Sequence, residues 1–252
     1  MSGPRGPDEE SMSPYLCHID PDCLRVEARV VARRPDAVLL DRSFFYPGGG
    51  GQLADRGTLA WEGGTVTVDR IETQGANAWH CFDAADAGNV PGDRVVAAVD
   101  ADFRFLMSQL HTGLHLLNAL VYQRFEGSLV TGVQMAADGT ARIDFDLPAA
   151  DNNALRALEP ALNGLIADGR PVKALYLDAA ALAREPGVLR SRSVAPPAQA
   201  DGTTRIIEIE GLDRQACGGT HLSNTAQSAP LRILKIENKG QHNRRIRIGL
   251  AR

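Results

Sequence analysis

The hydrophobic periodicity of the chain changes near residue 100, and this change limits the folds that are possible. Before that point, short runs rich in β-branched and aromatic residues alternate with turn residues, as is typical of strands. After it, residues 102–125 carry apolar side chains at helical spacing. The sequence therefore predicts an α+β chain with an all-β first part, a boundary near residue 100 and a mixed second part.

The first part is predicted to form a small β-barrel. Arg34-Pro35-Asp36 and Glu62-Gly63-Gly64 indicate hairpin turns between neighbouring strands. Several short strands separated by turn residues are typical of such barrels. The strands are expected at residues 24–31, 37–44, 58–61, 65–71, 78–82 and 94–99.

A glycine-rich loop lies between the first two hairpins. Residues 45–52 read Phe-Tyr-Pro-Gly-Gly-Gly-Gly-Gln, which excludes regular structure. Four glycines permit a close approach of the backbone, so the loop is expected to lie against a ligand or another domain. A merely flexible turn is the alternative.

The second part combines helices with strands. The helix at 102–125 is expected to end before Gly127, and a second helix is indicated at 155–166. Pro160 inside the second pattern predicts a kink or a late helix start. Strands are expected at 128–135, 140–145, 172–177, 205–209, 231–237 and 245–250.

The composition excludes several classes of protein. Hydrophobic residues make up 44% of the chain and charged residues 23%, as in ordinary globular proteins. No apolar run reaches the length of a membrane span, so no membrane association is expected. Residues 1–14 lack the apolar segment of a secretory signal and are expected to be a disordered lead-in. Four cysteines are too few for a disulfide framework, which favours a reducing, cytoplasmic location.

Positive charge gathers at the end of the chain although the net charge is −4. The net charge argues against a general nucleic-acid coating protein. Residues 231–252, however, hold seven basic residues and a single acid, Glu237. This segment indicates either a local contact with an anion or a strand edge protected by charge.

Two pairs of residues have the spacing of metal ligands. His111 and His115 lie one helical turn apart, so both imidazoles project from one helix face. Thr112 stands where a zinc metalloprotease has its glutamate base, which excludes that chemistry. Alone, such a pair is equally typical of ordinary surface or core histidines.

The second pair lies within Cys217-Gly218-Gly219-Thr220-His221, where two glycines permit a tight fold of the backbone. Alone, it is also explained by a buried thiol and a loop histidine. Together the two pairs supply three imidazoles and one thiolate, a complete tetrahedral set for one zinc ion per chain. Because catalysis needs an open position, one ligand would have to loosen, the coordination expand, or water lie beside the ion.

These segments resemble the editing domain of alanyl-tRNA synthetase and the free-standing AlaX proteins. The resemblance extends to residues 127–130 and 142–146, to residues 208–217 and to residues 237–245. Residues 45–57 resemble the glycine-rich motif of the N-terminal barrel of the medium-length AlaX proteins, so the resemblance covers about residues 15–252. Threonyl-tRNA synthetase editing domains share the architecture, but the Gly-Gly-Thr spacer is similar to the alanine branch.

The resemblance implies a lead-in at 1–14, a β-barrel domain at 15–100 and an α+β editing domain of the threonyl/alanyl-tRNA synthetase type at 101–252. Without an adenylation segment, the chain is expected to be a trans-editing enzyme of protein biosynthesis. It would deacylate tRNA for alanine that wrongly carries serine, or glycine, by contact with the acceptor end. Zinc would either polarise the ester and activate water, or hold the substrate amino group.

Further site residues are predicted around this chemistry. Gln52, Thr131 and Gln134 are candidates for reading the serine hydroxyl, because a hydrogen bond discriminates better than size. Their alternatives are turn and strand-surface positions. The candidates for tRNA contact are Lys239, Arg244 and Arg245 at phosphates, and Asn243 at the ribose or as a turn cap.

Two other functions are compatible with the same ligand set. The first is a zinc-dependent hydrolase or lyase of a small metabolite, because the four ligands do not identify the substrate. The second is a non-catalytic RNA-binding module in which the zinc is structural.

Overall fold

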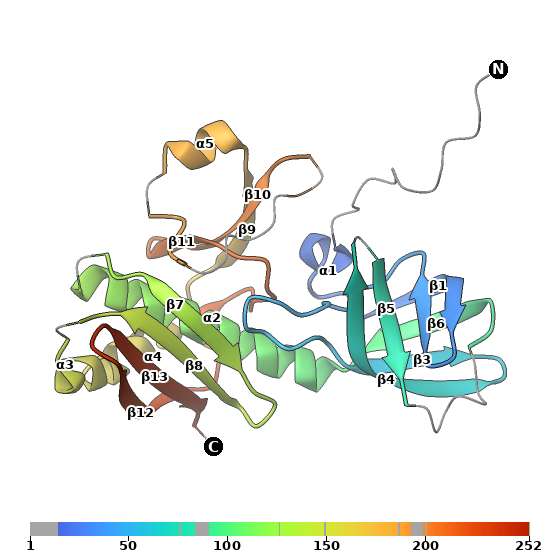
Figure 1. The fold of residues 1–252 in the computed structure, drawn as a ribbon, viewed down its shortest axis with the longest axis horizontal. Helices are drawn as coiled ribbons and strands as arrows, with labels where there is room; N and C mark the ends of the chain where they lie inside the picture. Colours follow the sequence, from blue (N-terminus) through green and yellow to red (C-terminus); the bar gives the residue numbers. More distant parts are fainter. Residues whose placement is uncertain are drawn as a thin grey trace.

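The computed structural model describes residues 15–75, 77–83, 91–125, 127–148, 150–185, 187–192, 199 and 201–251. The predicted lead-in at 1–14 lies outside these residues. A closed barrel and a mixed α+β part are joined by one long helix, α2, which starts beside the barrel and runs along the four-stranded sheet of the second part (Figure 1). The predicted α+β class is thus confirmed. Among the described helices, none is both long enough and apolar enough to cross a membrane.

The barrel closes through six antiparallel strands in the order β1-β2-β5-β4-β3-β6. Alternate side chains such as Leu59, Val66 and Val68 point inward and are buried, as the pleat of a strand requires. The second strand ends at Leu40 rather than Phe44, because Asp41 turns to accept the Arg29 backbone N–H. The strands are β1 (Arg25–Arg34), β2 (Ala37–Leu40), β3 (Gly57–Trp61), β4 (Gly64–Gln74), β5 (Asn77–Phe82) and β6 (Arg94–Val99).

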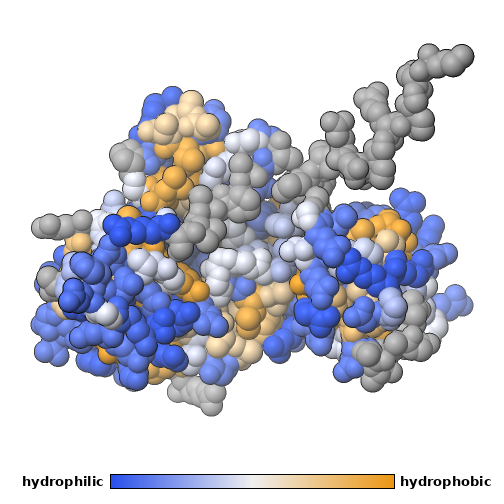
Figure 2. Space-filling view, in the orientation of Figure 1, coloured by the Kyte–Doolittle hydropathy of each residue, from blue (hydrophilic) through white to orange (hydrophobic). Residues whose placement is uncertain are grey.

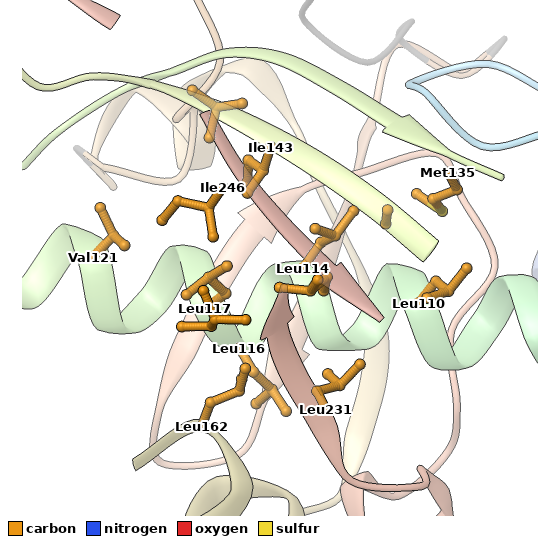
Figure 3. Packing of buried hydrophobic residues seen from close by; sticks show 14 of the residues in the cluster. Leu110, Leu114, Leu116, Leu117, Val121, Met135, Ile143, Leu162, Leu231 and Ile246 are labelled. Atoms are coloured by element: carbon orange, nitrogen blue, oxygen red, sulfur yellow. The ribbon is translucent and has the colours of Figure 1, made fainter. Parts of the chain in front are cut away.

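Helix α2 (Ala101–Arg124) begins directly after the barrel, where the Asp100 side chain accepts the Phe103 backbone N–H as an N-cap. One face of α2, with Leu114, Leu117 and Val121, packs against a four-stranded sheet (Figure 3). That sheet has the order β12-β13-β8-β7. Its strands are β7 (Val130–Met135), β8 (Thr140–Asp146), β12 (Leu231–Lys239) and β13 (Asn243–Leu250).

The second predicted helix is two short helices, α3 (Asn152–Arg156) and α4 (Glu159–Ala167). Pro160 lies in the first turn of α4, where its missing N–H removes no hydrogen bond. The late helix start that Pro160 indicated is therefore the one found. Leu162 of α4 is fully buried close to Leu116 of α2 and Leu231 of β12 (Figure 3).

A separate three-stranded sheet has the order β11-β10-β9 and lies above the four-stranded sheet in the view of Figure 1. Its strands β9 (Val172–Leu177) and β10 (Thr204–Ile209) were predicted, whereas β11 (Asp213–Ala216) was not. The other unpredicted elements are α1 (Leu16–Ile19), α5 (Ala179–Ala183) and the 3₁₀ turn η2 (Thr225–Gln227).

The glycine-rich loop leaves the barrel and reaches strand β7. Gly48, Gly49, Gly50 and Gly51 all have positive φ, which L side chains rarely adopt. The Gly51 carbonyl accepts the Met135 backbone N–H at 2.8 Å. A Cβ atom at Gly51 would lie 2.4 Å from the Val133 carbonyl oxygen, so only glycine permits this approach. The loop therefore lies against the second part of the chain rather than turning freely in solvent.

Candidate metal centre

Four side chains from two distant segments meet at the middle of α2. Helix α2 carries His111 and His115 one turn apart, and the loop after β11 carries Cys217 and His221. One ligand atom of each residue lies within 4.8 Å of those of the other three. All three imidazole rings are in mutual contact, with centroids 4.4–5.2 Å apart. The structure thus brings together the four residues that the sequence pattern paired.

The separations between these atoms fit a tetrahedral zinc ion. Cys217 Sγ lies 3.3 Å from His111 Nε2 and 3.4 Å from His221 Nε2. Bond lengths of about 2.3 Å to sulfur and 2.0–2.1 Å to nitrogen place such pairs about 3.6 Å apart at a tetrahedral angle. The small difference is within the reach of side-chain rotation, so the donor set can close around zinc.

Burial keeps the three imidazoles in the neutral form that binds metals. Burial, with the nearby His115 and Arg205, holds the pKa of His111 well below its usual value. Burial and the Arg190 guanidinium lower the pKa of His115 to about 3. Burial, with the nearby His111 and His115, also holds the pKa of His221 well below its usual value. Burial raises the pKa of the Cys217 thiol, and binding of a cation would favour the loss of its proton.

Two of the histidines are oriented through their second nitrogen. His111 Nδ1 lies 2.8 Å from Gln52 Oε1, a side chain of the glycine-rich loop. His221 Nδ1 lies 3.3 Å from Thr112 Oγ1, which also accepts the Leu222 backbone N–H at 3.1 Å. Such partners fix which nitrogen faces a metal. Thr112, which replaces the protease glutamate, therefore has an orienting role.

The loop that carries Cys217 is held tightly over His111. A Cβ atom at Gly219 would lie 2.1 Å from His111 Cε1, so this position has no room for a side chain. The buried Arg205 donates through Nη1 to the carbonyls of Cys217 and Gly219, both at 2.9 Å. These bonds turn the Gly219 N–H toward Cys217 Sγ, at 3.4 Å.

A cavity of about 610 Å³ opens beside the ligand cluster. Its lining includes the ligand His221 and the buried Arg205, with Val172, Ile207 and Tyr176 from the three-stranded sheet. His18 of α1 also lines it, and its Nε2 donates to the Gly218 carbonyl at 2.7 Å. A volume of this size is typical of ligand sites, and the lining mixes these apolar side chains with charged ones, among them Lys173 and Asp201.

The other residues predicted to read the substrate hydroxyl lie on β7. Thr131 is half-buried, with Oγ1 3.4 Å from Asn243 Oδ1, and Gln134 is exposed and accepts from Arg142 Nε at 3.0 Å. Neither residue is among those that line the cavity. Gln52 is the one of the three that contacts a ligand histidine.

The predicted tRNA-contact residues lie in the β12–β13 hairpin. This sheet has a largely hydrophilic outer face (Figure 2). Arg245 forms a bidentate ion pair with Asp144 of β8: Nε donates to Oδ1 at 2.7 Å and Nη2 to Oδ2 at 2.8 Å. Arg244 donates to the Pro148 carbonyl, and Lys239 is exposed. Within the described part of the chain, neither Lys239 nor Arg244 forms an ion pair.

Sequence reasoning did not find Arg205, Thr220 or His18 as residues of this region. Each acts through contacts with residues far away in the chain, which no local pattern reveals. The only available signal was the Gly-Gly-Thr spacer, because it placed Thr220 beside a ligand.

The sequence matches two family models. Residues 19–103 match tRNA synthetases class II (A), and residues 204–247 match the threonyl and alanyl tRNA synthetase second additional domain. The alanyl-tRNA editing protein AlaX-M of Methanosarcina barkeri is 36% identical over 83% of this chain and 86% of that protein. The AlaX-M protein of Saccharolobus solfataricus is 33% identical over 87% of this chain and 91% of that protein. The alanine–tRNA ligase of Korarchaeum cryptofilum is 34% identical over 86% of this chain but only 24% of the ligase.

Proposed function

Because this chain belongs to the family of alanyl-tRNA editing proteins, we propose that it is a trans-editing aminoacyl-tRNA deacylase. Its substrate would be tRNA for alanine that carries the wrong amino acid, with serine as the first candidate and glycine as the second. The observation that carries the proposal is the His111, His115, Cys217 and His221 cluster beside a cavity. The division into a barrel domain, residues 15–100, and an editing domain, residues 101–252, belongs to the same proposal.

The donor set supports zinc as the metal. Three neutral imidazoles and one thiol are ligands that zinc prefers, and the site holds its donors at near-tetrahedral separations. A zinc ion bound there supplies Lewis acidity toward the ester carbonyl and the attacking water. The chain itself fixes the donors: Thr112 orients His221, and Arg205 holds the loop of Cys217.

The cavity supports an aminoacyl end as the group that is bound. Val172 and Ile207 give it an apolar wall, and Tyr176 provides an aromatic ring that can stack on a base. Because His221 lines the same cavity, a ligand in it would have its reactive end close to the metal centre. The roles of Thr131 and Gln134 in reading a serine hydroxyl stay predictions.

The β12–β13 hairpin is the proposed contact with the tRNA backbone. Lys239 and Arg244 are the better phosphate ligands, because the Arg245 guanidinium is already occupied by Asp144. Asn243 lies beside them at the start of β13 and is a candidate for ribose contact. The proposed surface therefore comprises Lys239, Asn243, Arg244 and, more weakly, Arg245.

Replacing Lys239 and Arg244 together with alanine should raise the KM for tRNA and leave kcat little changed. Each lost phosphate contact should flatten the dependence of log KM on log salt by about one unit. Steady-state deacylation at several salt concentrations measures this slope. Arg70→Ala, on the barrel, serves as the control with an unchanged slope. A variant slope equal to that of the wild type would remove the hairpin from the RNA interface.

The proposed function is tested by release of serine from Ser-tRNA for alanine. The wild-type chain should release serine, and Cys217→Ala, which lacks the thiolate ligand, should be at least about 100-fold slower. Correctly charged Ala-tRNA is the control substrate and should stay intact. If the zinc-loaded wild type released no serine, the proposed deacylase activity would be refuted. The metabolite hydrolase and the RNA-binding module would then be favoured. Full activity of folded Cys217→Ala would refute the zinc mechanism alone.

A further inference from the structure

The amide of Gln52 has an orientation that its neighbours fix. The Thr220 backbone N–H is a donor only, and it lies 3.0 Å from Gln52 Oε1. The atom that faces it must therefore be the amide oxygen. The same oxygen lies 2.8 Å from His111 Nδ1, so Nδ1 carries the hydrogen in this contact. It follows that His111 Nε2 keeps its lone pair, and this is the nitrogen that faces Cys217 Sγ.

The other end of the amide is held just as firmly. Gln52 Nε2 donates to Thr220 Oγ1 at 2.9 Å, and Thr220 Oγ1 lies 2.9 Å from Ser108 Oγ of α2. Gln52 is 4% exposed, so solvent does not compete for these bonds. Three segments thus meet in one polar network: the glycine-rich loop, α2 and the loop that carries Cys217.

The glycine-rich loop delivers Gln52 to this place because it is anchored on both sides. The backbones of Gly49 and Gln52 bond to each other, and the Gly51 carbonyl accepts from Met135 of β7. Asp55, which is fully buried, accepts from the Tyr46 backbone N–H and pairs with the buried Arg104 of α2. The barrel loop is therefore fixed to α2 on one side and to β7 on the other.

We propose that Gln52 is a positioning residue for the ligand His111, and that the barrel loop thereby forms part of the metal centre. This inference rests on the metal site of the proposed function. A glutamine fully engaged in this way orients the imidazole and raises its basicity as a ligand. It gives Gln52 a role different from reading the substrate hydroxyl.

The test compares Gln52→Leu, which removes the acceptor for His111 Nδ1–H, with Gln52→Glu, which retains one. Zinc affinity is measured in the whole chain by competition with a chromogenic chelator. Gln52→Leu should weaken zinc binding about 10- to 100-fold, whereas Gln52→Glu should bind within a few-fold of wild type. With cobalt as a spectroscopic probe, Gln52→Leu should shift the visible absorption bands and Gln52→Glu should restore them.

Controls separate a local effect from a loss of structure. Gln74→Leu removes an exposed barrel glutamine that accepts from Arg34, and it should leave zinc affinity and the cobalt spectrum unchanged. Should Gln52→Leu fail to fold, Thr220→Val, which removes the hydroxyl that anchors the amide, should give a smaller shift of the same kind. Wild-type affinity and spectrum in the folded variants would overturn the inference. A wild-type chain that binds neither zinc nor cobalt would instead refute the metal centre of the proposed function.

Discussion

Gly219→Ala should severely weaken metal binding by His111, His115, Cys217 and His221. The added methyl group would lie 2.1 Å from His111 Cε1, 2.3 Å from His111 Nδ1 and 2.8 Å from Gln52 Oε1. Neither neighbour can move away, because each is bonded to the other and both are buried. We expect zinc affinity to fall by at least about 100-fold, and deacylation with it. Chelator competition and the deacylation assay measure the two effects.

The neighbouring glycine provides a matched control. A Cβ atom at Gly218 would have no atom within 4 Å, and Gly218 does not have a positive φ. Gly218→Ala should therefore bind zinc like the wild type, although it lies one residue away and in the same motif. Equal affinities for the two alanine variants would contradict the close approach of His111 to Gly219.

Asp55→Ala should destabilise the chain by about 3–5 kcal/mol, because it leaves a buried arginine without its counter-charge. Asp55 and Arg104 are 0% and 5% exposed, and Arg104 Nε lies 3.0 Å from Asp55 Oδ2. Arg104 also donates to the Phe44 and Pro21 carbonyls, so it cannot turn to solvent without breaking those bonds. Urea unfolding of the metal-free protein gives the change in the free energy of unfolding.

An exposed ion pair of the barrel shows what to expect without burial. Asp93, whose side chain is 94% exposed, lies 2.6 Å from Arg33. Asp93→Ala should change the free energy of unfolding by less than about 1 kcal/mol. A loss of similar size in both variants would mean that burial of the Asp55–Arg104 pair has no energetic consequence. Asp55→Ala should also weaken zinc binding, because the loop that carries Gln52 loses its anchor.

Periodicity predicted the elements that bury apolar side chains on one face. The barrel strands and α2 follow from this pattern, since Leu59 and Leu114 belong to hydrophobic cores. Strand β11 escaped prediction because its inward side chains are polar. Asp213 pairs with Arg190, and Gln215 accepts from Asn118 of α2. A strand that buries an ionic network has no apolar alternation to reveal it.

The ligand pairs could be predicted because each pair is local in sequence. One helical turn joins His111 to His115, and a four-residue step joins Cys217 to His221. The contact of Gln52 with His111 could not be predicted, because His111 lies 59 positions further along the chain. Charge alone also could not show that Arg245 pairs with Asp144, a partner set by the register of β13 and β8.

The charges of the four donor side chains set the net charge of a metal centre formed here. A divalent ion held by three uncharged rings and one sulfur anion would keep an excess of positive charge, whereas four sulfur anions would reverse its sign. The Gly219 N–H draws electron density from that sulfur and increases the excess. With such an ion bound, the centre would attract an ester oxygen and repel a protonated amine. Such a field would favour entry of an aminoacyl group with its carbonyl foremost.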